Sequence, residues 1–347
     1  MNQIAENIKQ RLSLRKPLQE ALDILTHLAG ELELKKEVDL KTELEKVQAL
    51  YPTCTDFERE FVSICYSIAT GVGKTRLMGA CIAWLYLEKG IKNFFVLAPN
   101  LTIYNKLIED FGNSSNPKYV FNGIADFVHN KPVIITGDNY NQVSSLFSET
   151  EIRINIFNVS KFARETKPTK EGGRNLAPSI KRLSEYLGQS YWEYLSNLND
   201  LVILMDEAHR YHADKSKEAI NELKPILGLE LTATPIDERQ NQFRNVVYEY
   251  SLAQALTDGL YVKNPTIATR KDFNPQGRSE EEIEKIKLED AVSIHEDTKQ
   301  ELKLFALNTG KRLVKPFILV VCKDTTHAKA VYDLISSVDF YEGAFAD

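Results

Sequence analysis

The chain has 347 residues, 43% hydrophobic and 27% charged, a balance that is ordinary for a globular protein with one large or two modest domains. This composition excludes an intrinsically disordered chain, a collagen and a small disulfide-rich scaffold. The net charge is −6, with 43 Lys and Arg against 49 Asp and Glu, so any surface that binds nucleic acid must be a local basic patch.

Cysteine usage and the lack of long apolar runs indicate the compartment. The four cysteines form no CxxC pair and are predicted to be reduced core thiols: Cys54, Cys65, Cys81 and Cys322. The first residues are polar, and no apolar run approaches the ~18–20 residues that a membrane span requires. We therefore expect a cytoplasmic protein that does not associate with a membrane.

Residues 1–50 are predicted to form a helical N-terminal extension. Apolar residues recur there at helical spacing, as in Ile4, Ile8 and Leu12, and Gly30 separates this part from a further charged helix. We interpret the extension as a packing or partner-docking element.

From about residue 51, short apolar runs alternate with longer helical stretches, which is typical of a mainly parallel sheet in an α/β fold. After an apolar run at 61–66, the predicted strands are Phe94–Ala98, Val133–Thr136, Ile152–Asn158, Leu201–Met205 and Leu227–Leu231. Polar residues with Gly and Pro predict a loop over 161–179. A turn followed by a charged helix is predicted at 270–290, and one strand followed by one helix at 315–338.

The strongest signal for function is the segment Ser67–Thr75, SIATGVGKT, between an apolar run and a predicted helix. Its GKT ending matches a Walker A phosphate loop, although an isoleucine replaces the first glycine of the full pattern. Gly71 and Gly73 permit the backbone angles that turn consecutive amides around phosphates. Lys74 can then reach the β- and γ-phosphates, and the Thr75 hydroxyl can bind Mg²⁺.

A second signal is the apolar strand 201–205, which runs directly into the acidic sequence DEAH. Such a strand presents carboxylates at the carboxyl edge of a sheet, where ligands bind in open α/β folds. Asp206 is predicted to hold Mg²⁺, and Glu207 is predicted to orient and deprotonate the attacking water. A third strand runs into TATP, where Thr232 and Thr234 can hydrogen-bond the DEAH segment or its water.

In this order, TGVGKT, DEAH and TATP resemble motifs I, II and III of superfamily 2 DEAD/DEAH-box helicases and translocases. The closer resemblance is to the motor of the Res (R) subunit of type III restriction enzymes, and it covers about residues 60–340. Residues 96–107 lie where motif Ia is expected, and 245–270 are similar to the segment that follows motif III. The strand and helix of 315–338 are similar to the opening of a second RecA-like domain.

The resemblance implies a RecA-like P-loop NTPase that binds ATP and Mg²⁺ and hydrolyses ATP while it acts on double-stranded DNA. It implies catalytic roles for Lys74, Asp206 and Glu207, with Thr75 and Asp206 as the Mg²⁺ ligands. The residues implied to bind ATP are Thr70, Gly71, Val72, Gly73, Lys74 and Thr75, and those implied to couple the nucleotide to DNA are His209, Thr232 and Thr234. A modification or specificity subunit is a candidate partner.

Other binding residues are candidates by position only. Motif Ia and the region after strand 152–158 suggest Asn100, Thr102 and Lys161 as DNA contacts. The segment 161–182 is either a solvated basic loop or a DNA-facing arm, with Lys161, Arg164, Lys167, Lys170, Arg174, Lys181 and Arg182. Upstream of motif I, Phe57 and Arg59 are candidates for adenine recognition, the alternative being the start of an amphipathic helix.

We therefore predict four parts: a helical extension (1–50), a RecA-like ATP-binding domain (51–269), a linker or helical connection (270–312) and the incomplete start of a second RecA-like domain (313–347). Motifs V and VI and the nuclease domain that the resemblance implies are not recognisable. The chain is therefore expected to be the N-terminal portion of a larger protein or a short relative. Without the arginine finger of motif VI, hydrolysis is expected to be slow.

A phosphate loop would also serve two other functions. An ATP-binding regulatory switch that does not translocate would use the same phosphate loop and stays open as the alternative. A P-loop kinase or GTPase is disfavoured, because DEAH and TATP are not expected there and the NKxD guanine-reading motif is missing.

Overall fold

The structure is a computed structural model, and it describes residues 2–140, 151–158, 189–263, 270–271 and 273–346. Lys161 and the basic segment 161–182 lie outside these residues. The chain divides into two compact units, Met1–Pro265 and Thr266–Asp347. No helix in the described part of the chain is long and apolar enough to cross a membrane.

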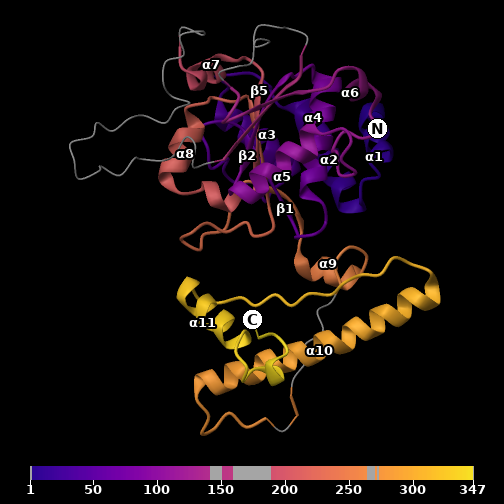
Figure 1. Cartoon of the computed structure of the whole chain (residues 1–347). Coiled ribbons are helices and arrows are strands. Elements are labelled where there is room, and N and C mark those ends of the chain that lie inside the picture. The colour runs from indigo at the N-terminus through magenta and orange to yellow at the C-terminus, as the bar shows by residue number, and fades with distance from the viewer. Residues whose placement is uncertain (1, 141–150, 159–188, 264–269, 272, 347) are drawn as a thin grey trace. The chain divides into compact units, whose positions relative to one another are not determined.

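The first unit is built around a parallel sheet (Figure 1), whose strand order is β3-β4-β2-β5-β6-β1-β7 in the described residues. The strands are β1 (Ser63–Ile68), β2 (Asn93–Ala98), β3 (Val133–Thr136), β4 (Arg153–Asn158), β5 (Leu201–Asp206), β6 (Leu227–Thr232) and β7 (Val246–Tyr250). Every pairing is parallel, so the carboxyl ends of all these strands lie along one edge. The α/β fold and the five predicted strands are confirmed, whereas β7 was not predicted.

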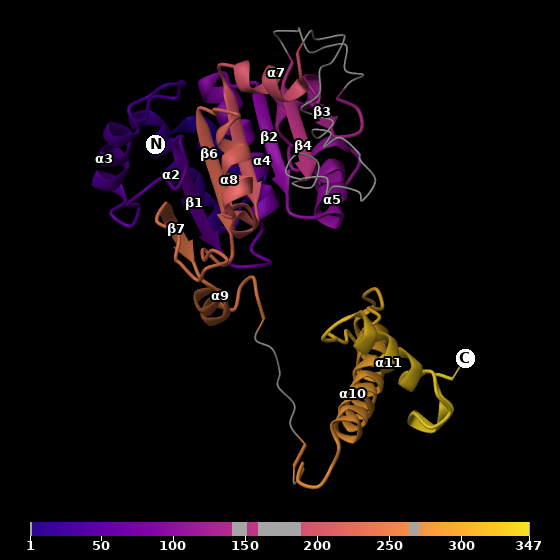
Figure 2. The ribbon, with the colours of Figure 1, turned by 90° about the vertical axis from the view of Figure 1, so that its left-hand side faces the viewer.

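Two layers of helices cover the sheet because alternate residues of each strand face opposite sides. In β5, Val202 and Leu204 join one core, and Leu201, Ile203 and Met205 join the other. The first core includes α1 (Gln3–Arg11), α2 (Lys16–Glu31), α4 (Lys74–Lys89) and α5 (Leu101–Gly112), and the second includes α7 (Tyr191–Asn197), the 3₁₀ helix η3 (Ala208–Tyr211) and α8 (Asp214–Asn221) (Figure 2). The other helices in the described part of this unit are α3 (Leu40–Leu50), α6 (Ala125–His129) and α9 (Leu252–Asp258).

The N-terminal helices are part of the core of the first unit. Ile8, Leu18 and Leu22 are at most 2% exposed and belong to the same core as the sheet, and both α1 and α2 pack against α4. All four cysteines are free; Cys54, Cys65 and Cys81 are buried, as expected of core thiols, and Cys322 is partly exposed.

The second unit contains α10 (Glu280–Thr309), α11 (Thr325–Ile335) and the 3₁₀ helix η4 (Tyr341–Gly343). The charged helix after residue 270 is confirmed as α10, and the helix predicted within 315–338 is confirmed as α11. The strand predicted before α11 is wrong. Phe317, Leu319 and Val321 are 82%, 76% and 86% exposed and have no strand assignment. A strand requires a neighbour for its backbone hydrogen bonds, and the described residues of this unit provide none.

Candidate active site

The predicted phosphate loop connects the carboxyl end of β1 to the first turn of α4. Gly71 and Gly73 have φ angles of +85° and +121°, a region that favours glycine because it has no Cβ. No side chain caps the N-terminus of α4, so the first amides of the helix remain available to an anion. The loop therefore has the backbone shape and the free donors that a phosphate group requires.

The loop lysine meets the acidic pair that follows β5. Lys74 Nζ lies 3.2 Å from Glu207 Oε1 and 3.4 Å from the carbonyl oxygen of Ile68. The Lys74 side chain is 9% exposed and that of Glu207 is 30% exposed. The structure thus brings together two predicted catalytic groups that are far apart in the chain. They follow β1 and β5, which lie on either side of β6 in the sheet.

Asp206 carries a charge that burial opposes. It is 6% exposed, and burial, together with the neighbouring Glu207 charge, raises the pKa of Asp206 to about 6, although Lys74 and Lys106 act in the opposite direction. A buried carboxylate that lacks full charge compensation fits a cation ligand. Mg²⁺ prefers such oxygen donors and takes one or two from the protein beside those of substrate phosphates, so Asp206 fits a Mg²⁺ ligand. The role of Thr75, whose hydroxyl accepts a hydrogen bond from Lys106, stays a prediction.

Lys106 is a site residue that the sequence analysis missed. It lies on α5, and its Nζ donates to Thr75 Oγ1 at 3.3 Å and lies 3.6 Å from Asp110 Oδ2. Lys106 therefore lies beside the phosphate loop, and its charge, like that of Lys74, lowers the pKa of Asp206. The only sequence signal was the position of Lys106 within the segment compared with motif Ia.

The three predicted coupling residues form one hydrogen-bonded group. His209 Nδ1 lies 3.0 Å from Thr232 Oγ1 and 3.5 Å from Thr234 Oγ1, and the amide of Thr234 donates to Thr232 Oγ1 at 3.1 Å. His209 Nδ1 is also 3.7 Å from Glu207 Oε2. Burial lowers the pKa of His209, although the charge of Glu207 opposes this effect.

Of the predicted DNA contacts, two lie at the carboxyl edge of the sheet. Asn100 caps α5, because its side chain accepts a hydrogen bond from the amide of Ile103 at 2.9 Å. Thr102 is exposed in the first turn of the same helix. Since the cap explains Asn100 structurally, the DNA role of these residues stays a prediction.

Residues 51–62 contain no helix, so the alternative of an amphipathic helix start is wrong. The other candidate role, adenine recognition, finds no accessible side chain at Arg59. Its side chain is fully buried against Glu230, with Arg59 Nε donating to Glu230 Oε1 at 3.0 Å, and Phe57 is a core residue that is 3% exposed. Both side chains are therefore occupied inside the protein and unavailable to a nucleotide base.

Instead, the start of α2 reaches the phosphate loop. Arg15 Nη1 donates to the carbonyl oxygens of Gly71 at 2.6 Å and Val72 at 3.0 Å, and its guanidinium lies 5.0 Å from the ring centroid of Tyr261. Beside this contact is a pocket of about 260 Å³ that is lined by Lys16, Pro17, Glu20, Tyr248, Glu249, Tyr250, Gln254, Asp258, Leu260 and Tyr261. Arg15 and Gly71 are 56 residues apart in the chain, and no local pattern indicates that they meet.

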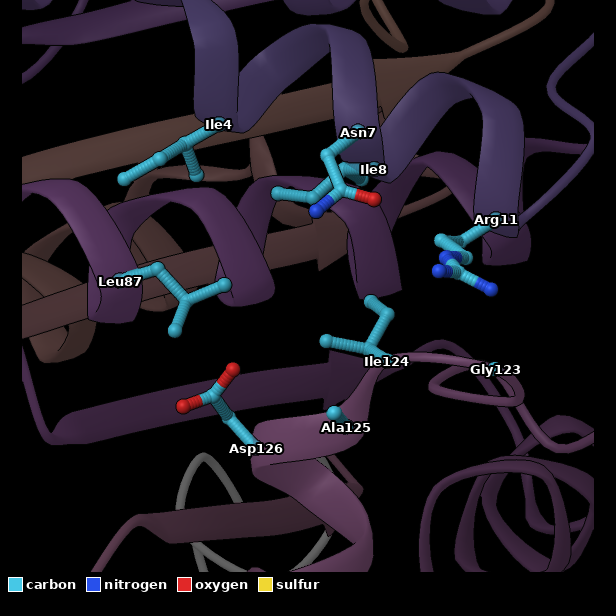
Figure 3. Close-up of a pocket in the computed structure, with 9 residues that line it drawn as sticks. All are labelled: Ile4, Asn7, Ile8, Arg11, Leu87, Gly123, Ile124, Ala125 and Asp126. Carbon is cyan, nitrogen blue, oxygen red and sulfur yellow. The ribbon is translucent and has the colours of Figure 1, made fainter.

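Another hollow, of about 330 Å³, lies between α1, α4 and the start of α6 (Figure 3). Ile4, Leu87 and Ile124 line it, with Arg11 and Asp126 on opposite sides. Its lining includes none of the predicted site residues, and we do not include it in the nucleotide site.

Comparisons with known proteins agree with this arrangement of motifs. A family model described as "Type III restriction enzyme, res subunit" matches residues 39–237. A putative type I restriction enzyme endonuclease subunit, MjaIXP of Methanocaldococcus jannaschii, is 27% identical over 128 residues, which is 35% of this chain and 12% of that relative. The chain thus spans only a small part of this relative's length.

Two solved structures are distantly similar. The ATP-dependent Type ISP restriction-modification enzyme LlaBIII bound to DNA matches with a TM-score of 0.37 and 16% identity over 65% of this chain and 16% of that chain. The SWI2/SNF2 ATPase core of Sulfolobus solfataricus in complex with dsDNA matches with a TM-score of 0.31 and 17% identity, over 59% of this chain and 34% of that chain. These scores are too low to add anything to the fold that the parallel sheet defines.

Proposed function

Because this chain belongs to the family of type III restriction enzyme Res subunits, we propose that it is an ATP-hydrolysing motor that acts on double-stranded DNA. We further propose that it serves the restriction subunit of a type III or related defence system in the cytoplasm. The observation that carries the proposal is the 3.2 Å approach of Lys74 to Glu207, because a phosphate-binding lysine and a carboxylate base must meet at one triphosphate.

In this proposal, ATP rearranges the charges at the carboxyl edge of the sheet. Lys74 leaves Glu207 for the β- and γ-phosphates, and the freed Glu207 carboxylate orients the attacking water and accepts its proton. Thr75 and Asp206 would hold Mg²⁺, which when bound neutralises charge on the phosphate oxygens. Since His209 contacts both Glu207 and Thr232, it can transmit the state of the base to the end of β6.

We also propose that the adenine base binds in the pocket beside α2. The pocket adjoins the phosphate loop through Arg15, and Tyr248 and Tyr261 offer aromatic surface for a base. The proposal that Asn100 and Thr102 contact DNA is supported by their position just after β2, at the carboxyl edge of the sheet.

The decisive measurement is ATP hydrolysis by the full chain with and without duplex DNA. Glu207→Gln is expected to lower kcat about 10²–10⁴-fold, as expected for loss of a general base, and to leave ATP affinity within about threefold, because the phosphate loop is unchanged. Glu218→Gln, an exposed substitution on α8, is the matched control and should hydrolyse ATP at the wild-type rate.

DNA decides between the two functions that stay open. Stimulation of hydrolysis by duplex DNA supports the motor. Tight ATP binding without turnover, with DNA present or absent, would contradict the motor and favour the regulatory switch.

A further inference from the structure

Two side-chain contacts connect the η3 segment to β6, one at each end of the η3 turn. At the edge of the sheet, His209 meets Thr232 at 3.0 Å. One turn further along η3 and two residues back along β6, His212 Nε2 meets Glu230 Oε2 at 2.8 Å. The motif comparison includes the first contact, but neither the motifs nor the proposed function assigns a role to the second.

The inner contact belongs to a buried ionic cluster. Glu230 is completely buried in the middle of β6, and its Oε1 accepts hydrogen bonds from Arg59 Nε at 3.0 Å and Ser63 Oγ at 2.9 Å. Burial alone would raise the pKa of Glu230, but the Arg59 charge and the bond from His212 outweigh it and hold the pKa at about 2. Glu230 is therefore an anion inside the protein, and its two oxygens are both occupied.

The same cluster holds the far end of η3. Arg59 Nη1 donates to the carbonyl oxygen of Tyr211 at 3.1 Å, and the ring of His212 stacks on Phe243 with centroids 3.7 Å apart. Arg59 thus bonds to the strand through Glu230 and to the helix through Tyr211. The last residues of η3 are attached to the sheet by both backbone and side-chain contacts.

η3 needs such an attachment because its own structure is weak. It is a single 3₁₀ turn, closed by a hydrogen bond from Arg210 N to Glu207 O at 2.9 Å, and short 3₁₀ turns have poor hydrogen-bond geometry. Glu207 begins the turn with φ +52° and ψ +56°, a left-handed conformation that residues with a side chain adopt only when their surroundings hold them there.

We propose that Arg59, Glu230 and His212 are positioning residues that fix η3 against β6 and thereby set the places of Glu207 and His209. The inner contact is rigid, because the side chains of His212 and Glu230 are 4% and 0% exposed. The outer residue His209 is 25% exposed and has Glu207, Thr232 and Thr234 within reach. A fixed inner contact allows His209 to exchange partners without displacing the catalytic carboxylate. Only the catalytic part of this inference rests on the proposed function.

The structural part is tested by amide hydrogen exchange of the full chain. His212→Phe keeps an aromatic ring against Phe243 but removes the hydrogen bond to Glu230, whereas His212→Gln restores a donor. We expect exchange across residues 207–212 to become at least about tenfold faster in His212→Phe and to return toward the wild-type rate in His212→Gln. Unchanged exchange in His212→Phe overturns the proposal.

A matched control comes from the same face of the sheet. Tyr191→Phe removes the buried hydrogen bond from Tyr191 to Asn155, at 2.5 Å, and should leave exchange across 207–212 unchanged. If this control changes exchange there as much as His212→Phe does, a general loosening explains both, and the positioning role is wrong. Glu230→Gln is a poorer first choice, because it leaves the Arg59 charge buried without its counter-ion.

The catalytic part is tested by single-turnover ATP hydrolysis. His212→Phe is expected to lower the rate about tenfold with ATP affinity within twofold, and His212→Gln to recover most of it. In a Glu207→Gln background, His212→Phe should have no further effect, because it acts through the carboxylate that has been removed. If His212→Phe lowers the hydrolysis rate equally in the wild-type and Glu207→Gln backgrounds, it does not act through Glu207, and the catalytic part of the proposal is overturned. If Glu207→Gln itself loses nothing, the proposed function fails, while the exchange experiment still decides the structural part.

Discussion

Asp206 illustrates how a single residue of the site can reduce the stability of the protein. Burial raises its pKa to about 6 from 3.8, so between about pH 4 and pH 6 the native state holds a proton that the unfolded chain releases. The free energy of unfolding therefore falls as pH rises through this window. Above about pH 6 Asp206 is ionised in the native protein, and the full free energy of burying its charge then opposes folding.

We predict that Asp206→Asn stabilises the protein at pH 7.5 by about 1–3 kcal/mol, because the asparagine is neutral and still accepts the hydrogen bond from the backbone amide of Glu207. The gain should shrink toward zero as the pH approaches 4. Thermal unfolding in EDTA at pH 7.5 and pH 5 measures it, with an expected rise in Tm of several degrees at the higher pH. The same variant should lose the effect of Mg²⁺ on ATP affinity. A variant less stable than the wild type at pH 7.5 would show that Asp206 is better compensated than its burial indicates.

The residues that the sequence analysis identified and those that it missed differ in a physical way. Lys74, Asp206 and Glu207 follow buried strands or open a helix, and the carboxyl edge of a parallel sheet brings such positions together whatever the details of packing. Lys106 contacts Thr75 from a neighbouring helix, and Arg59 is buried against Glu230. Contacts of this kind depend on the orientation of each helix and loop in the folded protein. A local sequence pattern carries no information about that orientation.

Among the elements, α2 has an unexpected relation to the phosphate loop. Arg15, just before the helix, holds the carbonyls of Gly71 and Val72, and Leu18 lies so close to Gly73 that a Cβ there would come within 3.2 Å of it. Because Arg15 binds two carbonyl oxygens of the loop, the loop amides remain free to face a phosphate. Residues at the start of α2 therefore stabilise the conformation of the phosphate loop.

We predict that Arg15→Met weakens ATP binding about tenfold, since hydrogen bonds from a charged donor contribute about 1.5–3 kcal/mol when shielded and less at this exposed site. The methionine keeps an apolar stem against Tyr261, so Tm should change by less than about 2 °C. Equilibrium binding of a fluorescent ATP analogue provides the measurement. Arg239→Met removes an exposed ion pair with Asp214 in the same unit and is the control, expected to bind like the wild type. Equal affinity of Arg15→Met and the control would argue against a supporting role.

The strands show where hydrophobic patterning is sufficient as a guide and where it is not. β2 and β5 are buried on both faces and are nearly continuous apolar runs, as expected of central parallel strands. β4 and β6 are buried as deeply but include polar residues. β7 is an edge strand of mixed burial that includes the charged residue Glu249, so its pattern is weaker. The apolar run before α11 has the composition of a strand but forms none. No strand in the described residues of its unit lies beside it to accept its backbone hydrogen bonds.

The buried cores of the described residues divide the chain at the same place as its two compact units. The two large cores draw their buried residues from Ala5 to Ala255, and the third from Leu288 to Phe340, so they share no described residue. Among the residues that the structure describes, the third core has four buried members: Leu288, Val292, Val331 and Phe340. A core of that size cannot offset the conformational entropy of ordering its unit. The predicted boundary between 1–50 and 51–269 has no counterpart in the cores, since the N-terminal helices belong to the first one.

We therefore predict that a chain ending at Lys263 keeps a cooperative thermal transition within about 2 °C of the full chain and binds ATP with the same affinity. Residues 270–347 alone should show helical circular dichroism without a cooperative transition. The 30 residues of α10 exceed the length of about 12–15 residues below which isolated helices are marginal, whereas the packing is insufficient for cooperativity. Removal of residues 1–31 is the contrasting variant: it strips Ile8, Leu18 and Leu22 from the first core and should abolish cooperative unfolding. Calorimetry of the three chains distinguishes these outcomes.

A fall in Tm of about 10 °C on ending the chain at Lys263 would mean that the first unit depends on the second for its stability. Cooperative folding of the chain that lacks residues 1–31 would mean that the N-terminal helices are an appendage and not part of the core.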